Sequence, residues 1–177
     1  MNRRLKVFLV SMFAASAVPI ASAHDAKPVT QSQVIEQPIN IVWSAIQGLR
    51  TCDPEHRKLI SYHNNEALIE EKFFALPVVG DTSCTYKECE VPPNQIKYTL
   101  IKSDHFRQFE GSWTLTPMGE NKTMVCLSST LDAGLRIPFW KEITKTATKT
   151  SVLHRLKQLS SEADRVATLH GSIAARR

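Results

Sequence analysis

Two groups of acidic residues are the first features that could do chemistry. Glu70 and Glu71 are adjacent, and Glu88 and Glu90 are two residues apart, within stretches rich in β-forming residues. A carboxyl group buried in a cavity has a raised pKa and can act as a general acid or base. Because successive side chains of a strand point to opposite faces, at least one of Glu70 and Glu71 must point away from any cavity. We interpret both groups as charged residues on an exposed strand face, and we assign no catalytic residue.

Other catalytic and ligating patterns are missing from the sequence. It contains no Gly-x-Ser-x-Gly motif, and its histidines have no nucleophile at a characteristic spacing. The cysteines form no Cys-x-x-Cys pair, and no histidine-rich segment stands at zinc-ligand spacing. The sequence therefore predicts neither a metal site nor a cofactor.

The four cysteines, Cys52, Cys84, Cys89 and Cys126, allow three complete disulfide pairings. If residues 82–91 form one strand, Cys84 and Cys89 lie about 16 Å apart on opposite faces, far beyond the roughly 6 Å span of a disulfide. We expect Cys52 to bond to one of these two, with Cys126 packed in the core. The alternative is that all four are packing residues.

The N-terminal segment has the composition of a secretory signal peptide. The first six residues carry three basic side chains and no acid, residues 7–20 are almost wholly apolar, and Ala21, Ser22 and Ala23 follow. The apolar stretch is shorter than the roughly 20 residues of a membrane span, so a retained anchor is the less favoured alternative. We expect cleavage after Ala23, no stable membrane span afterwards, and a periplasmic or secreted bacterial protein in a compartment that permits disulfides.

Composition and charge indicate one globular domain that does not bind nucleic acid. The chain has 177 residues, of which 42% are hydrophobic and 22% are charged. Its net charge of +5 would suit an anionic partner, but removing residues 1–23 lowers the basic side chains from 22 to 19, against 17 acidic ones. The remaining net charge of +2 gives nucleic-acid binding little electrostatic support.

Hydrophobic periodicity predicts an α+β protein. A strand over Thr30–Glu36 precedes a helix over Ile39–Leu49 and a second short helical piece over Glu55–Lys58. A helix from Pro138 to about Leu169 ends the pattern and spans roughly 45 Å at about 1.5 Å per residue, enough to cross a sheet. Between them lie six runs of β-forming residues separated by short turns, which imply antiparallel pairing: Leu59–His63, Ala67–Leu76, Asp81–Val91, Gln95–Lys102, His105–Pro117 and Lys122–Leu131.

This order of elements resembles the START-like (SRPBCC) superfamily, especially its polyketide cyclase/dehydrase and lipid-transport branch. The stretches that carry the resemblance are Gln37–Trp43, Phe109–Pro117 and Gly134–Trp140, and the resemblance covers residues 30–165. It implies the helix-grip fold, in which a curved antiparallel sheet of about seven strands wraps around a long C-terminal helix, with two short helices after the first strand. The chain would then comprise a signal peptide (1–23), a flexible mature N-terminus (24–29), a START-like domain (30–169) and a disordered tail (170–177).

The resemblance also implies an apolar cavity between the concave sheet and the long helix. Gly111 is of interest because a glycine within a strand leaves room for a close approach, and the alternative is that it marks a bend in the sheet. The expected lining is Phe73, Tyr98, Phe109, Gly111, Trp113, Leu127, Leu131, Phe139, Trp140 and Ile143.

The function implied is binding of a hydrophobic small molecule or lipid, as a carrier or ligand-presenting protein. One alternative is a cyclase- or dehydrase-type enzyme that acts on a hydrophobic carbonyl substrate in the same cavity. Another is a protein-interaction module that uses the sheet edge or the loop around Pro92 and Pro93. Because no catalytic constellation is recognisable, we favour binding.

Overall fold

The computed structural model describes residues 26–76, 78–135 and 137–174. The predicted signal peptide lies outside the described residues. Along the described chain the elements are β1 (Val29–Ile35), α1 (Ile39–Gly48), β2 (Arg57–His63), β3 (Glu66–Leu76), β4 (Gly80–Val91), β5 (Gln95–Ser103), β6 (Gln108–Pro117), β7 (Thr123–Asp132) and α2 (Trp140–Ala174).

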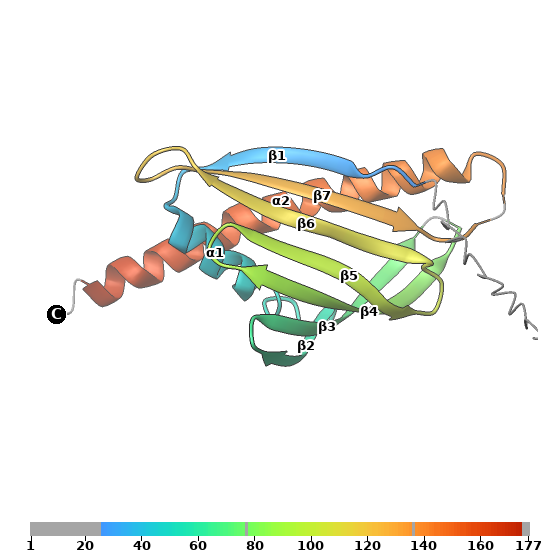
Figure 1. Cartoon of the computed structure of the whole chain (residues 1–177), viewed down its shortest axis with the longest axis horizontal. Coiled ribbons are helices and arrows are strands. Elements are labelled where there is room, and N and C mark those ends of the chain that lie inside the picture. Colours follow the sequence, from blue (N-terminus) through green and yellow to red (C-terminus); the bar gives the residue numbers. More distant parts are fainter. Residues whose placement is uncertain (1–25, 77, 136, 175–177) are drawn as a thin grey trace, which may run out of the picture.

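The strands form one antiparallel sheet in the order β1-β7-β6-β5-β4-β3-β2. Helix α2 crosses behind this sheet over its whole length, and α1 lies on the same side (Figure 1). The curved sheet and the two helices enclose the core, so the predicted α+β helix-grip architecture is confirmed.

Local sequence explains why α1 forms where it does. Pro38, with a φ of −64°, precedes the first helical residue, and proline at a helix start loses no intrahelical hydrogen bond. Apolar side chains then recur at helical spacing and are buried in the core, where α1 contacts α2 and β6: Ile41, Val42, Trp43, Ala45 and Ile46.

Several element boundaries differ from the sequence prediction, most clearly at the second short helix and at the end of α2. The second short helix is a single turn, in which the carbonyl of Asp53 accepts hydrogen bonds from the amides of His56 and Arg57, and β2 begins at once. Arg57 is the first residue of β2, where it pairs with Glu71 of β3 and its side chain donates a hydrogen bond to the Glu71 carboxylate. At the other end, α2 continues through Ala174, past Leu169 where we expected the helix to end. None of the described helices combines the length and the apolar composition needed to cross a membrane.

All four cysteines are free thiols, so the disulfide predicted from Cys52 is not formed. Strand β4 separates Cys84 from Cys89 as the strand interpretation required. The thiol of Cys84 is buried, and burial raises its pKa to about 12. Cys89 lies on the other face of β4, where it contacts the carboxylate of Glu66 at 3.4 Å.

Candidate functional site

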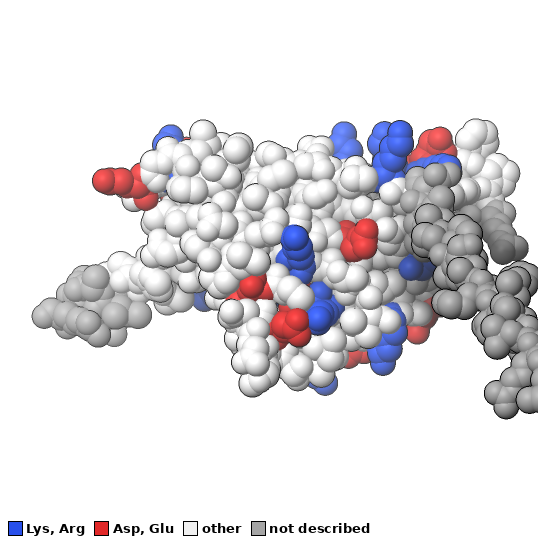
Figure 2. Space-filling model, viewed as in Figure 1, with Lys and Arg blue, Asp and Glu red and all other residues white. Residues whose placement is uncertain are grey.

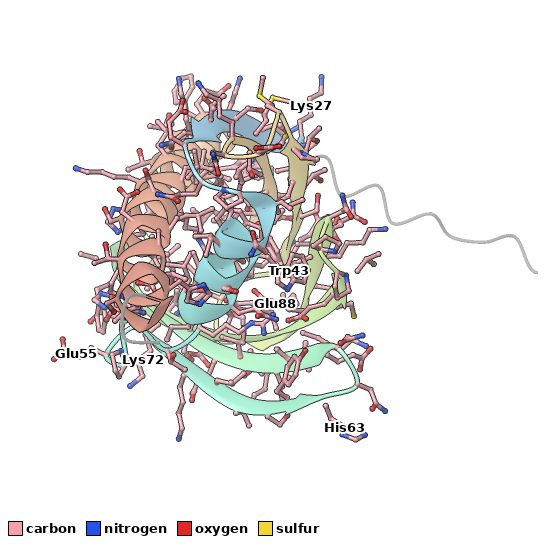
Figure 3. The ribbon with its side chains drawn as sticks, turned by 90° about the vertical axis from the view of Figure 1, so that its left-hand side faces the viewer. Lys27, Trp43, Glu55, His63, Lys72 and Glu88 are labelled. Carbon is pink, nitrogen blue, oxygen red and sulfur yellow. The ribbon has the colours of Figure 1, made fainter. Side chains whose placement is uncertain are left out.

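A group of buried charged residues lies between the sheet and the helices. Glu71 on β3 and Glu88 and Glu90 on β4 are only 6%, 6% and 8% exposed. The interpretation of these carboxylates as exposed strand-face charges is therefore wrong. Burial is possible because arginine side chains from distant parts of the chain reach them. Figure 3 shows Glu88 inside the molecule with Trp43, whereas Glu55 and His63 lie at its periphery.

Glu71 is held by three donors. The Nη2 atoms of Arg57 and Arg155 donate to its Oε1 at 3.0 and 2.7 Å, and the Tyr86 hydroxyl donates to its Oε2 at 2.9 Å. Burial alone would raise the pKa of Glu71, but the two guanidinium groups outweigh burial and lower this pKa from 4.5 to about 2. Burial and the Glu71 charge raise the pKa of Tyr86 well above its usual value. Glu71 is thus an anion at neutral pH, and Tyr86 is a neutral donor.

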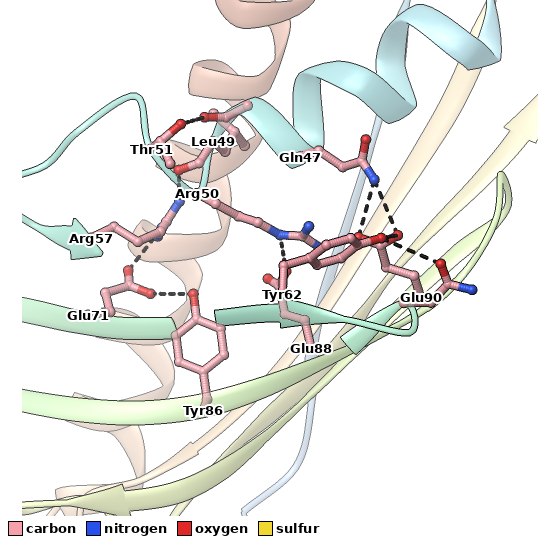
Figure 4. Close-up of polar contacts among 12 residues, drawn as sticks. Gln47, Leu49, Arg50, Thr51, Arg57, Tyr62, Glu71, Tyr86, Glu88 and Glu90 are labelled. Carbon is pink, nitrogen blue, oxygen red and sulfur yellow. Dashed lines mark hydrogen bonds and ion pairs between the residues drawn. The ribbon is translucent and has the colours of Figure 1, made fainter. Parts of the chain in front are cut away.

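A second group surrounds Arg50, directly after α1. Its Nε donates to Glu88 at 2.7 Å and its Nη2 to Glu90 at 2.5 Å, as Figure 4 shows. Glu90 also accepts hydrogen bonds from Gln47 at 3.2 Å and from the Tyr62 hydroxyl at 3.0 Å. Burial raises the pKa of Glu88, and the nearby Arg50 opposes this rise. These contacts tie the end of α1 to β4 and to β2.

A cleft of about 440 Å³ leads from the surface to Glu71. Phe73, Phe74 and Leu76 form its apolar part, and the buried pair of Glu71 and Arg155 forms its polar part. The full lining, drawn from the segment after α1, β3 and α2, is Cys52, Asp53, His56, Arg57, Glu71, Lys72, Phe73, Phe74, Leu76, Ser151, His154, Arg155 and Gln158.

An open groove of about 680 Å³ runs beside the first half of α2. Its surface is largely apolar, with Leu76, Ile143 and Ala147 among its lining residues. Leu76, Ser151 and His154 line both the groove and the cleft, so the two form one continuous depression.

The residues expected to line a central cavity lie in several environments. Tyr98, Phe109, Trp113 and Leu127 are buried in the core. Phe73 lines the cleft, and its ring packs edge-on against Phe109 with 5.8 Å between the ring centroids.

The remaining four expected residues lie around α2, and Gly111 lies within the sheet. Leu131 and Ile143 border a void of about 20 Å³, and Ile143 also lines the groove. Leu131 and Trp140 line a surface pocket, and Phe139 is 78% exposed. A Cβ atom on Gly111 would collide with the Tyr98 hydroxyl and the Ser128 carbonyl oxygen. The space beside this glycine is therefore filled by Tyr98, its cross-strand partner.

The sequence analysis missed Arg57 and Arg155, the two cations of the cleft that pair with Glu71. The only sequence signal for Arg155 is its position between Val152 and Leu156 on the apolar stripe of α2, where an arginine is unusual. Within the described ranges, no group of three histidine, cysteine or acidic residues is placed to hold a metal ion.

Comparisons with known proteins identify the architecture. No family model matches the chain, and no curated protein matches its sequence. Among solved structures, Zhui aromatase/cyclase from Streptomyces sp. R1128 is similar with a TM-score of 0.69 and 13% identity, over 79% of this chain and 94% of that one. A START superfamily protein from Mycobacterium smegmatis is similar with a TM-score of 0.64 and 14% identity, over 78% and 98%.

A plant enzyme extends the comparison. Norcoclaurine synthase from Thalictrum flavum is similar with a TM-score of 0.60 and 11% identity, over 93% of this chain and 99% of that one. Agreement over nearly the full length of three proteins, at identities this low, is agreement in fold. The chain has the START-like helix-grip fold.

Proposed function

We propose that this protein binds a hydrophobic small molecule or lipid and acts as a carrier. The observation that supports this most directly is the continuity of the apolar groove beside α2 with the cleft that ends at Arg155 and Glu71. Ligand sites are mostly apolar with a few oriented polar groups, and this depression has that composition. The START superfamily neighbour and the aromatase/cyclase neighbour are consistent with an apolar ligand.

The chemistry of the cleft favours binding over catalysis. A general acid or base works best with a pKa near the working pH, whereas the pKa of Glu71 is about 2. Its two oxygens already accept three hydrogen bonds from protein donors. Glu71 therefore organises the two arginines and is not placed to transfer a proton.

We also propose that the carrier works outside the cytoplasm, in the periplasm or after secretion. The support is the basic start, apolar middle and small-residue end of residues 1–23. A carrier in an aqueous compartment between membranes would shield an apolar ligand from water.

The test of ligand binding uses the neutral apolar fluorophore N-phenyl-1-naphthylamine. We expect a saturable rise in fluorescence with the wild type, and about 10-fold weaker binding after Ala147→Trp, because the indole would fill the groove. Ala167→Trp is the matched control, since it makes the same change on the same helix about 30 Å away. Absence of saturable binding by the wild type, or equal affinities of the two variants, would refute the proposal.

A further inference from the structure

Three arginines and three glutamates form ion pairs on the inner side of β3 and β4, so their charges sum to zero. The positive and negative charges are nevertheless unevenly distributed along the two strands. Arg50 alone faces two carboxylates, those of Glu88 and Glu90. At the other end, Arg57 and Arg155 share the single carboxylate of Glu71. Tyr86, the third partner of Glu71, is a neutral donor and does not change this count. The interior is therefore polarised, and its positive end faces the cleft.

The two arginines of the cleft also have donors to spare. A guanidinium group has five N–H donors. In the described part of the chain, Arg155 donates only through Nη2, to Glu71, and Arg57 donates to Glu71 and to the Leu49 carbonyl at 2.8 Å. The Nε of Arg57 is buried without a hydrogen-bond partner among the described residues. An acceptor entering the cleft would satisfy donors that the protein leaves unused.

The other charged residues around the cleft do not cancel the excess of positive charge at Arg57 and Arg155. Lys72 adds a cation on the rim, and Asp53 adds an anion that lies 3.0 Å from the ring of His56. Apart from its histidines, the lining then carries three cations against two anions. One negative charge on a ligand would make the cleft neutral.

We infer that the cleft binds the carboxylate of an amphipathic acid, whose apolar chain lies in the groove beside α2. This inference rests on the proposed function and specifies the polar end of its ligand. The planar fork of an arginine matches a carboxylate, and hydrogen bonds between charged groups are the strong ones. A phosphate monoester fits less well because it carries about −1.5 to −2 charges at pH 7, which exceeds the single positive charge available and repels Glu71.

The arrangement of α2 supports one ligand that spans both regions. His154 and Arg155 lie three and four residues after Ser151, and Gln158 lies four and three residues after them, so these side chains share a face of the helix. Ala147 lies one turn before Ser151 on the same face and lines the groove. A chain extending from Arg155 toward Ala147 would thus run along apolar surface.

The test compares three 12-carbon competitors in displacing bound N-phenyl-1-naphthylamine at pH 7.5. Dodecanoate should displace the probe at a concentration about 10-fold lower than methyl dodecanoate, and dodecyl phosphate should be weaker than dodecanoate. Equal potency of acid and ester would overturn the carboxylate inference and leave the proposed function standing. Failure of the probe itself to bind would refute the proposed function.

Two variants test whether Arg155 causes the preference for dodecanoate over methyl dodecanoate. Arg155→Met should reduce the difference in potency between acid and ester to about twofold or less, and this ratio is measured within one variant, so it does not depend on that variant's affinity for the probe. Lys58→Met removes one positive charge from the exposed face of β2, outside the cleft, and should keep the full preference. An undiminished preference in Arg155→Met would overturn the assignment. If Arg155→Met does not fold, Arg155→Lys, which keeps the charge but loses the fork, should show an intermediate preference.

Discussion

At the scale of single residues, Glu71 is the side chain on which the site depends. It receives hydrogen bonds from β2, β4 and α2, and these partners lie 14, 15 and 84 residues away in sequence. Removing one partner of a buried ion pair leaves the other charge without compensation, which is costly. Loss of the Glu71 carboxylate would leave two guanidinium groups facing each other.

The pH dependence of stability should report this role. The pKa of Glu71 is about 2 in the folded protein against 4.5 ordinarily, so its stabilising contribution is complete above about pH 4.5 and is lost as the pH falls toward 2. We expect Glu71→Gln to lower the free energy of unfolding by about 3 kcal/mol at pH 7. The difference from wild type should shrink between pH 5 and pH 2, as measured by urea unfolding.

The neighbouring Glu70 provides the control for that experiment. Glu70 lies on the other face of β3, and Glu70→Gln should change the free energy of unfolding by no more than about 0.5 kcal/mol. A difference between wild type and Glu71→Gln that stays constant from pH 7 to pH 2 would contradict the assignment.

Gly111 is the second residue that can be tested alone. A Cβ atom there would collide with Tyr98 and with the backbone of Ser128, so Gly111→Ala should destabilise the protein by about 1 to 3 kcal/mol. Gly171→Ala is the comparison, because a Cβ atom there meets open space in a helix, and it should be neutral or stabilising by up to about 1 kcal/mol. Thermal unfolding of both variants measures the difference, and an unperturbed Gly111→Ala would show that Tyr98 can move aside.

At the scale of secondary-structure elements, β1 and β2 are the two edge strands but are held differently. Strand β1 pairs with β7 and packs against α2. Strand β2 pairs with β3, and its last four residues are all exposed. Side-chain contacts of Arg57 with Glu71 and of Tyr62 with Glu90 fasten it to the interior. Polar contacts, more than apolar burial, thus hold this side of the cleft.

Hydrogen exchange should distinguish the two edges. We expect the amides of β2 to exchange faster than those of β1, because local opening of β2 exposes little apolar surface. Dodecanoate should slow exchange in residues 52–57, which contribute to the cleft, and leave β1 unchanged. Equal protection of β1 and β2 in the free protein would show that the ion pairs hold β2 as firmly as packing holds β1.

At the scale of the whole molecule, the ion pairs that Arg50, Arg57 and Arg155 form with Glu71, Glu88 and Glu90 give the interior an ordered arrangement of charge. The face seen in Figure 2 carries basic and acidic side chains interspersed among uncharged ones. This mixture agrees with the small net charge of +2 calculated for residues 24–177. The arginines at the inner end of the cleft can therefore select an anionic ligand by local charge, without a strongly basic net charge of the chain.

Processing of the N-terminus is the prediction that concerns the complete chain. Expression in a bacterium with an intact export system should yield periplasmic or secreted protein whose N-terminal sequence begins at His24. Replacing Ala23 by a bulky residue, as in Ala23→Phe, should slow cleavage, because the peptidase requires small side chains at the site. Protein that retains Met1 in the membrane fraction would contradict this prediction.

The sequence by itself determined the order of the strands and the long helix and the approximate extent of most of them. Strand β5 was predicted over Gln95–Lys102 and runs over Gln95–Ser103, and β7 was predicted over Lys122–Leu131 and runs over Thr123–Asp132. Alternation of apolar and polar residues is a local property, so it can be read without knowing what covers the strand. The same property, together with the long helix, indicated an α+β protein, and the resemblance to the START-like superfamily then implied the helix-grip fold.

Only the tertiary structure decided where the charges lie and where space remains. Glu71 could be buried because Arg155 arrives from a helix 84 residues later, and periodicity contains no information about such a pairing. The room predicted beside Gly111 is occupied by Tyr98 of the adjacent strand, and the open space lies instead beside α2 at Ala147. Contacts between distant residues depend on strand register and helix placement, which the chain acquires only when it packs.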